Sequence, residues 1–200
     1  MSCLVGLLTV TAWTACFRFP IVWQQTGIGE GDKPFLDLYG LLAAGDRAQA
    51  GFDASQPNPL DPYNRPNVYT EWWLVTGKIG LTRADTPWLG VGLILTALLA
   101  ALVVLRPGTA REATLTLGVL LSPAVLMLVS RANNDLVVFI LVSAALLLVR
   151  CEGIALRVMA MVIIVVTIVL KYYPLAGVLL LLHCRSRREA VIAGAAFFIL

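Results

Sequence analysis

The chain has few charged residues and a single histidine among its 200 residues. Charged side chains make up 14% of the sequence, whereas soluble globular domains carry about 25%. The one histidine, His183, leaves almost nothing from which to build a histidine-based triad or a histidine zinc site. The four cysteines are scattered without Cys-x-x-Cys spacing, which argues against both a metal-ligand motif and a disulfide framework.

Motifs that bind nucleotides and nucleic acids are also missing. The sequence contains no glycine-rich phosphate loop, no nucleic-acid-binding module and no paired metal-ligand motif. We therefore expect no nucleic-acid partner, no cofactor and no metal site.

Long apolar runs dominate what is present. Hydrophobic residues make up 59% of the chain and the mean hydropathy is +0.85, which indicates an integral membrane protein. A helix needs about 20 apolar residues to cross roughly 30 Å of hydrocarbon, with a lower limit of about 17. We expect an all-α, polytopic transmembrane helical bundle forming a single domain over residues 1–200. The expected spans are 1–17, 87–105, 113–129, 134–149, 154–170 and 172–184, with an incomplete run at 190–200.

Three points about these spans stay open. The last run is still apolar at Leu200, so we expect the sequence to be the N-terminal part of a longer protein. Residues 1–17 are either a retained first helix or a signal peptide, and the missing basic n-region favours the helix. Residues 154–184 form either two spans or one kinked span that places Lys171 inside the bilayer, and the basic cluster at 185–188 favours two.

The distribution of basic residues predicts the orientation. The short connections 106–112, 150–157 and 185–189 hold seven arginines and three glutamates, whereas the long loop 18–86 holds six basic and eight acidic residues. Because Lys and Arg in short loops prefer the cytoplasm, we expect a cytoplasmic N-terminus. The long loop and the connections at 130–135 and 171–174 then meet on the extracytoplasmic face.

The long loop predicts two interfacial helices joined by turns. Asp32 is expected to cap the first helix and Gly45 to end it. Asp37 should point away from the lipid, opposite an apolar stripe on the same helix. Residues 51–66 are rich in Pro, Asn and Asp and indicate ordered turns. From Pro66 a second amphipathic segment places three aromatic residues in the headgroup zone: Tyr69, Trp72 and Trp73.

Three polar motifs on this face are candidates for chemistry, and each has an ordinary structural alternative. Asp37 suits a general base, or is one of eight acids on a solvated loop. The segment Arg131–Asp135 suits a phosphate or sugar hydroxyls, or caps the following helix. Lys171 with the two tyrosines after it suits a phosphate at the headgroup plane, or is a snorkelling lysine with interfacial tyrosines.

Taken in order, these motifs resemble the GT-C superfamily of polytopic glycosyltransferases, specifically glycosyltransferase family 87. Members of that family have a first outer loop in which an Asp is followed shortly by Tyr, and then by a stretch rich in Gly, Pro and Tyr. Later in the chain, an amide-containing motif begins a Leu-rich helix, and a Lys-x-x-Pro motif follows that helix. The matching segments here are Asp37-Leu38-Tyr39, Gly51 through Asp61-Pro62-Tyr63 to Asn67-Val68-Tyr69, Arg131 to Asp135, and Lys171-Tyr172-Tyr173-Pro174. The sequence departs from the pattern at Thr70-Glu71, where Tyr-Pro-Pro is common, and at Arg131-Ala132, which replaces a Gly-containing lead.

The resemblance implies an inverting membrane glycosyltransferase of the plasma membrane. It would transfer a hexose, most simply mannose, from a polyprenyl-phosphate sugar donor to a lipid or glycan acceptor on the extracytoplasmic face. Asp37 would act as the general base, and side-chain cations would serve the leaving phosphate without an obligatory metal. The substrate-binding residues implied are Tyr39, Arg131, Asn133, Asn134, Asp135, Lys171 and Tyr172.

Two other classes of protein remain as alternatives. A polytopic transporter or lipid flippase would place polar residues near the midplane on broken helices, often with internal repeats, and no repeat is visible in the sequence. A non-catalytic membrane scaffold would use the acidic loop as a docking surface and would tolerate Asp37→Asn.

Overall fold

The computed structural model describes residues 1–18 and 34–171, and within them every regular element is a helix. The all-α prediction is confirmed for these residues. The elements, in order, are α1 (Ser2–Arg18), α3 (Leu36–Gln49), the 3-10 helix η1 (Glu71–Leu74), α4 (Val75–Lys78), the 3-10 helix η2 (Arg83–Asp85), α5 (Thr86–Leu105), α6 (Ala110–Leu120), α7 (Pro123–Ser130), α8 (Asp135–Arg150) and α9 (Ile154–Leu170).

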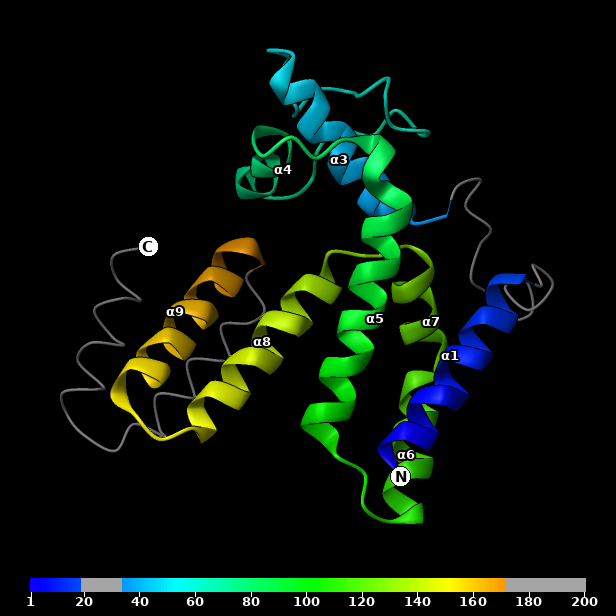
Figure 1. The fold of residues 1–200 in the computed structure, drawn as a ribbon. Helices are drawn as coiled ribbons and strands as arrows, with labels where there is room; N and C mark the ends of the chain where they lie inside the picture. Colours follow the sequence, from blue (N-terminus) through cyan, green and yellow to red (C-terminus); the bar gives the residue numbers. More distant parts are fainter. Residues whose placement is uncertain (19–33, 172–200) are drawn as a thin grey trace.

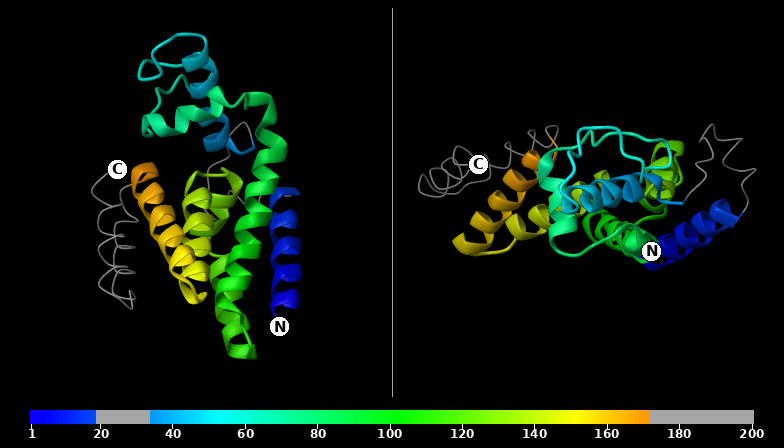
Figure 2. Two further views of the ribbon diagram at one scale, coloured as in Figure 1. Left: turned by 60° about the vertical axis from the view of Figure 1, so that its left-hand side comes forward. Right: turned by 90° about the horizontal axis from the view of Figure 1, so that it is seen from above.

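The structure has a helical bundle and a smaller cap. Helices α1 and α5 to α9 form the bundle, whereas α3 and α4 lie above one end of it (Figure 1). The turn between α7 and α8 and the C-terminal end of α9 lie at the capped end. The N-terminus and the α5–α6 and α8–α9 connections lie at the opposite end, and the second side view agrees (Figure 2). The described polar connections therefore gather at the end where the sequence predicted their convergence.

The bundle core joins α1 to α5, α6 and α7. Val5, Trp13, Ile94 and Val129 are buried in one apolar cluster. The indole of Trp13 also donates a hydrogen bond of 3.0 Å to the carbonyl of Leu120, at the end of α6. Further along the bundle, α8 packs against both α5 and α9.

Few of the described helices are long enough to cross a membrane. By length and composition, a 23-residue segment that includes α5, Arg83–Leu105, is long and apolar enough to do so. Helices α6 and α7 meet the same test only as a pair bent by 54°, and α9 is apolar but shorter. The expected span 113–129 is therefore divided between two helices that bend where they meet. The break has a local cause: Pro123 lies in the first turn of α7, and Ser122 caps that helix by accepting a hydrogen bond from the amide of Val125.

The first helix of the cap does not end at Gly45 as expected. Helix α3 continues to Gln49, so Gly45 lies inside the helix. Helix α4 packs against α3 at Gly45, which accounts for the glycine at this position. A Cβ atom on Gly77 of α4 would lie 2.5 Å from the carbonyl oxygen of Gly45, so only glycine permits this approach. The expected N-cap, Asp32, lies outside the described residues.

The second segment of the cap also differs from its prediction. The segment is short, with η1 followed directly by α4. Trp72 is exposed, but Trp73 is buried against α3 and donates a hydrogen bond of 3.3 Å to the carbonyl of Leu170 at the end of α9. Trp73 is therefore a core residue that ties the cap to α9 and not a headgroup residue.

Helix α9 ends at Leu170, and Lys171 has extended backbone with φ −154° and ψ 134°. The expected span 172–184, the run 190–200 and Tyr172 lie outside the described residues.

Candidate functional site

Helix α3 is joined to the α7–α8 turn through its backbone. Phe35 has left-handed backbone (φ 58°), which turns the chain into the helix. The amide of Phe35 then donates to the carbonyl of Ser130, at 3.0 Å, and the amide of Asp37 donates to the carbonyl of Arg131, at 3.1 Å. Because the first amides of a helix have no partner within it, these bonds satisfy the start of α3 and place its first turn on the bundle.

The side chain of Asp37 is buried in this junction and is held by two residues of the α7–α8 turn. The guanidinium of Arg131 donates from Nη2 to Oδ1 at 2.7 Å and from Nε to Oδ2 at 2.9 Å. Nδ2 of Asn133 donates to Oδ2 at 2.7 Å. The hydrogen bonds to Asp37 raise the pKa of Arg131. A carboxylate has about four lone-pair positions, so these three bonds leave one position on Oδ1.

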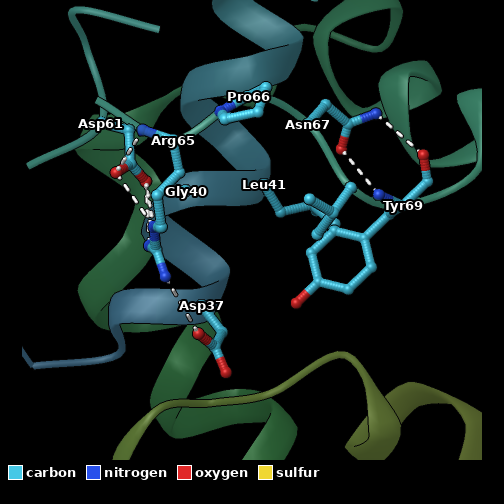
Figure 3. A pocket seen from close by; sticks show the side chains of 9 residues that line it. Asp37, Gly40, Leu41, Asp61, Arg65, Pro66, Asn67 and Tyr69 are labelled. Atoms are coloured by element: carbon cyan, nitrogen blue, oxygen red, sulfur yellow. Dashed lines mark hydrogen bonds and ion pairs between the residues drawn. The ribbon is translucent and has the colours of Figure 1, made fainter. Parts of the chain in front are cut away.

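A second arginine faces that remaining position. Nη1 of Arg65 lies 3.9 Å from Oδ1 of Asp37, too far for a hydrogen bond. Arg65 is held in place by Asp61, which accepts from Nε at 3.1 Å and from Nη2 at 2.9 Å (Figure 3). Burial by itself raises the pKa of Asp61, but hydrogen bonds from the Arg65 side chain and from the amides of Tyr63 and Arg65 outweigh it and lower that pKa. The hydrogen bonds with Asp61 raise the pKa of Arg65.

These groups line a cavity of about 160 Å³ between α3 and the 61–69 segment. Its walls are Asp37, Gly40, Leu41, Asp61, Arg65, Pro66, Asn67, Val68 and Tyr69. The Arg65 side chain and the Tyr69 hydroxyl both point toward Asp37 (Figure 3). Burial, and then the negative charge of Asp37, raise the pKa of Tyr69, so its phenol keeps its proton at neutral pH. The cavity therefore offers an acceptor at Asp37 beside donors at Arg65 and Tyr69.

A third ion pair lies beside this cavity. Nζ of Lys171 is 2.5 Å from Oδ1 of Asp135, and the same ammonium lies 5.6 Å from the centre of the Tyr69 ring. Oδ1 of Asn133 accepts from the amide of Asp135 at 2.9 Å, which connects the Asp37 cluster to the Lys171 pair. Tyr69 thus lies between the cavity on one side and Lys171 on the other.

The structure brings most of the residues predicted from sequence to one place. Asp37, Arg131 and Asn133 form one hydrogen-bonded cluster, and Asp135 and Lys171 form the pair next to it. Tyr39 is separate: it lines a different hollow, with Asp46, Thr82 and Arg83, and not the Asp37 cavity. The alternative interpretation of Asp37, as one of eight acids on a solvated loop, does not fit the structure, because only 7% of the residue is accessible.

Asn134 has an unusual position in this group. Its side chain is buried, and neither its amide nitrogen nor its amide oxygen makes a hydrogen bond. A buried amide without partners costs roughly 1–3 kcal/mol, so such a group calls for an explanation.

Reasoning from the sequence missed the Asp61–Arg65 pair. The two residues are four positions apart within the Pro-, Asn- and Asp-rich turns, and that opposite-charge spacing was the available signal. No periodic pattern marks it, because the segment forms turns and not a helix. Among residues 1–18 and 34–171, no group of three or more His, Cys, Asp or Glu side chains is placed to hold a metal ion.

The described structure is a helical bundle with long apolar segments and a polar site at one end. In a comparison with known protein families, the model of glycosyltransferase family 87 matches residues 78–200. The chain belongs to glycosyltransferase family 87, a membrane-associated family of glycosyltransferases. The matched region contains Arg131, Asn133 and Lys171, whereas Asp37 and Arg65 precede it. No curated protein and no solved structure matches the chain.

Proposed function

We propose that this glycosyltransferase transfers a hexose, most simply mannose, from a polyprenyl-phosphate sugar to a hydroxyl of a lipid or glycan acceptor. Oδ1 of Asp37 takes the proton of the acceptor hydroxyl, whose oxygen attacks the anomeric carbon of the donor. The bond from that carbon to the phosphate oxygen breaks, and polyprenyl phosphate leaves with the electron pair. Attack from the face opposite the phosphate inverts the anomeric carbon.

The observation that supports this proposal is the Asp37 junction. A buried carboxylate is fixed at three of its lone-pair positions, and the fourth faces a cavity. General-base catalysis needs a carboxylate that is held in place and still has one position open to the substrate. An acid that served only to attach the cap would not need to line a cavity.

The cations that would offset the charge of the leaving phosphate are Lys171 and Arg131. Each has an acid partner, Asp135 and Asp37 respectively. An ammonium has three donors and a guanidinium has five, so each can bind a phosphate oxygen and keep its acid partner. We also assign Asn134 to a sugar hydroxyl or to the phosphate, as an amide of the same turn; both of its unbonded amide atoms are covered in this structure.

The lipid chain of the donor has a matching apolar surface. A groove of about 310 Å³ runs between α5 and α8 and is lined by Trp88, Leu89, Gly92, Leu93, Thr96, Val137, Ile140 and Leu141. Leu89, Leu93 and Val137 also pack against the cluster that buries α3, so the groove begins directly below the site. A polyprenyl chain in this groove would bring its phosphate to the capped end of the bundle.

We also propose that the protein spans the plasma membrane several times, with a cytoplasmic N-terminus and the cap on the extracytoplasmic side. Large apolar side chains such as Leu95 and Leu99 of α5 are more than half exposed in the structure, which suits contact with lipid. The arginine-rich short connections support the orientation.

The test uses the full-length protein in membranes with radiolabelled polyprenyl-phosphate mannose. Wild type should release polyprenyl phosphate and label an acceptor lipid or glycan, and Asp37→Asn should slow labelling about 10²- to 10⁴-fold. Asp53→Asn is the matched control, because Asp53 is an exposed acid of the same loop that bonds only to its neighbours. Equal transfer by wild type and Asp37→Asn would show that Asp37 is not the base. Donor that crosses the membrane intact would indicate a transporter instead.

A further inference from the structure

We infer that Arg65 is a second catalytic residue of this site, and that it positions the attacking hydroxyl of a monosaccharide ring that is the acceptor group. The inference rests on the proposed transfer reaction and names the class of its acceptor. It starts from the gap of 3.9 Å between Nη1 of Arg65 and Oδ1 of Asp37.

That gap has the width that one oxygen atom can bridge. A hydroxyl oxygen placed about 2.8 Å from each atom accepts a hydrogen bond from Nη1 and donates its own hydrogen to Oδ1. Its second lone pair is then left for attack on the anomeric carbon. During the reaction the proton moves to Asp37, and the hydrogen bond from Arg65 stays on the oxygen.

The rest of the Arg65 side chain is held as such a role requires. Nε and Nη2 are bonded to Asp61, whose side chain is only 3% exposed, and the guanidinium lies 5.5 Å from the centre of the Tyr63 ring. In contrast, Nη1 makes no hydrogen bond to the described residues. One edge of the guanidinium is therefore anchored, and the other faces Asp37 across the cavity.

Helix α3 is shaped to receive this pair. A Cβ atom on Gly40 would lie 2.8 Å from Oδ2 of Asp61 and 3.2 Å from Nη2 of Arg65. Gly40 has ordinary helical backbone, so the glycine is needed for space and not for its conformational freedom. The absence of a side chain at this position lets the ion pair rest against the helix one turn after Asp37.

The size and lining of the cavity suit a single sugar ring. Its volume of about 160 Å³ equals roughly five water molecules at ~30 Å³ each, which leaves room for about one hexose ring. The walls combine the ring of Tyr69 and the apolar edges of Leu41 and Pro66 with the polar side chains of Asn67 and Arg65. A sugar has the same combination, with apolar C–H faces and hydroxyl edges.

The experiment compares wild type with Arg65→Gln in the full-length protein. Octyl α-mannoside, octyl β-glucoside and octyl β-galactoside serve as acceptors, together with the monodeoxy analogues of the best one. Loss of a charge-assisted hydrogen bond, worth about 1.5–3 kcal/mol, should lower kcat/KM for the acceptor about tenfold to a hundredfold. The KM for the polyprenyl-phosphate donor should change less than twofold. In binding measurements, wild type should discriminate against the deoxy analogue that lacks the attacked hydroxyl, and Arg65→Gln should discriminate less, because only the hydrogen bond to Asp37 remains.

A second variant keeps every charge. Gly40→Ala should displace the Asp61–Arg65 pair and lower acceptor kcat/KM severalfold, and the higher helix propensity of alanine should offset part of the stability lost with the displaced pair. Gly118→Ala is the control, since a Cβ atom there meets nothing within 4 Å, and it should leave transfer unchanged.

Two results would overturn the inference and leave the transfer reaction intact. One is transfer to acceptors in native membranes but to none of the three octyl hexosides. The other result has two parts: Arg65→Gln lowers kcat/KM equally for the donor and the acceptor, and it discriminates against the deoxy analogue as strongly as wild type does. That result would indicate a purely structural role for Arg65. If wild type releases no polyprenyl phosphate with any acceptor, the proposed function itself is wrong.

Discussion

The ion pair between Asp37 and Arg131 is expected to stabilise the folded protein as well as to serve the reaction. In Asp37→Asn the side chain keeps its shape, but its amide nitrogen faces a hydrogen-bond donor, because all three groups bonded to Asp37 are donors. Removing one partner of a fully buried pair costs about 3–5 kcal/mol. Arg131 is 39% exposed, so water compensates part of this loss, and we expect a decrease of about 2 kcal/mol in the free energy of unfolding.

A double-mutant cycle isolates the pair. Arg131→Gln alone should destabilise by a similar amount, and the double variant Asp37→Asn/Arg131→Gln should cost less than the sum, with a coupling energy of about 1–2 kcal/mol. Denaturant unfolding of the protein in detergent micelles measures these values. A coupling within about 0.5 kcal/mol of zero would refute the pairing, because independent sites are additive to that precision.

Transfer rates separate the catalytic role from the structural one. General-base catalysis typically contributes about 10²- to 10⁴-fold, so Asp37→Asn should lose that much of kcat. Gly77→Ala lies outside the site and is expected to destabilise the protein by a similar amount, because a Cβ atom there would lie 2.5 Å from the carbonyl oxygen of Gly45, so it should lose clearly less of kcat. Equal losses of kcat in Asp37→Asn and Gly77→Ala would refute the assignment of Asp37 as the base.

Three further predictions concern the cap. Gly77→Ala should destabilise the protein by about 1–3 kcal/mol, because its new methyl group would collide with the backbone at Gly45, whereas Gly118→Ala should be neutral or slightly stabilising in the same thermal unfolding assay. Asp61→Asn should lower the unfolding temperature at pH 7. The pKa of Asp61 is lowered in the folded state, so the Asp61 carboxylate stabilises the folded protein above its ordinary pKa of 3.8. This stabilisation is lost as the pH falls below that value. The difference in unfolding temperature between Asp61→Asn and wild type should therefore disappear at low pH. Trp73→Phe should cost about 1 kcal/mol and increase hydrogen exchange in the cap, because it removes the indole bond to the end of α9; unchanged exchange would argue against that attachment.

The helices of the bundle follow from local sequence. Helix α5 covers the expected span 87–105 within one residue, and α9 covers 154–170. Apolar runs and their polar ends are local properties, so they can be read without knowing what each helix contacts. The bend at Ser122-Pro123 also has a local signal in the sequence, because proline is common in the first turn of a helix and Pro123 lies in the first turn of α7.

In the cap, the local sequence did not predict the roles of two residues. Gly45 looks like a helix end because glycine often follows one, yet here it admits Gly77 from another segment. Likewise, Trp73 has the composition of an interfacial residue, but its indole bonds to a carbonyl 97 positions later. Each of these residues owes its role to a contact with a distant segment, which no periodicity of three or four residues records.

The sequence by itself determined the helical class, the positions of most bundle helices and the family, and it placed Asp37, Arg131 and Lys171 at one end of the molecule. Only the tertiary structure decided how these residues are paired: Asp37 with Arg131 and Asn133, and Lys171 with Asp135. The physical reason is that helix formation depends on neighbours along the chain, whereas a buried carboxylate must be satisfied by whichever donors the fold brings to it, and here those donors lie 94 and 96 positions away.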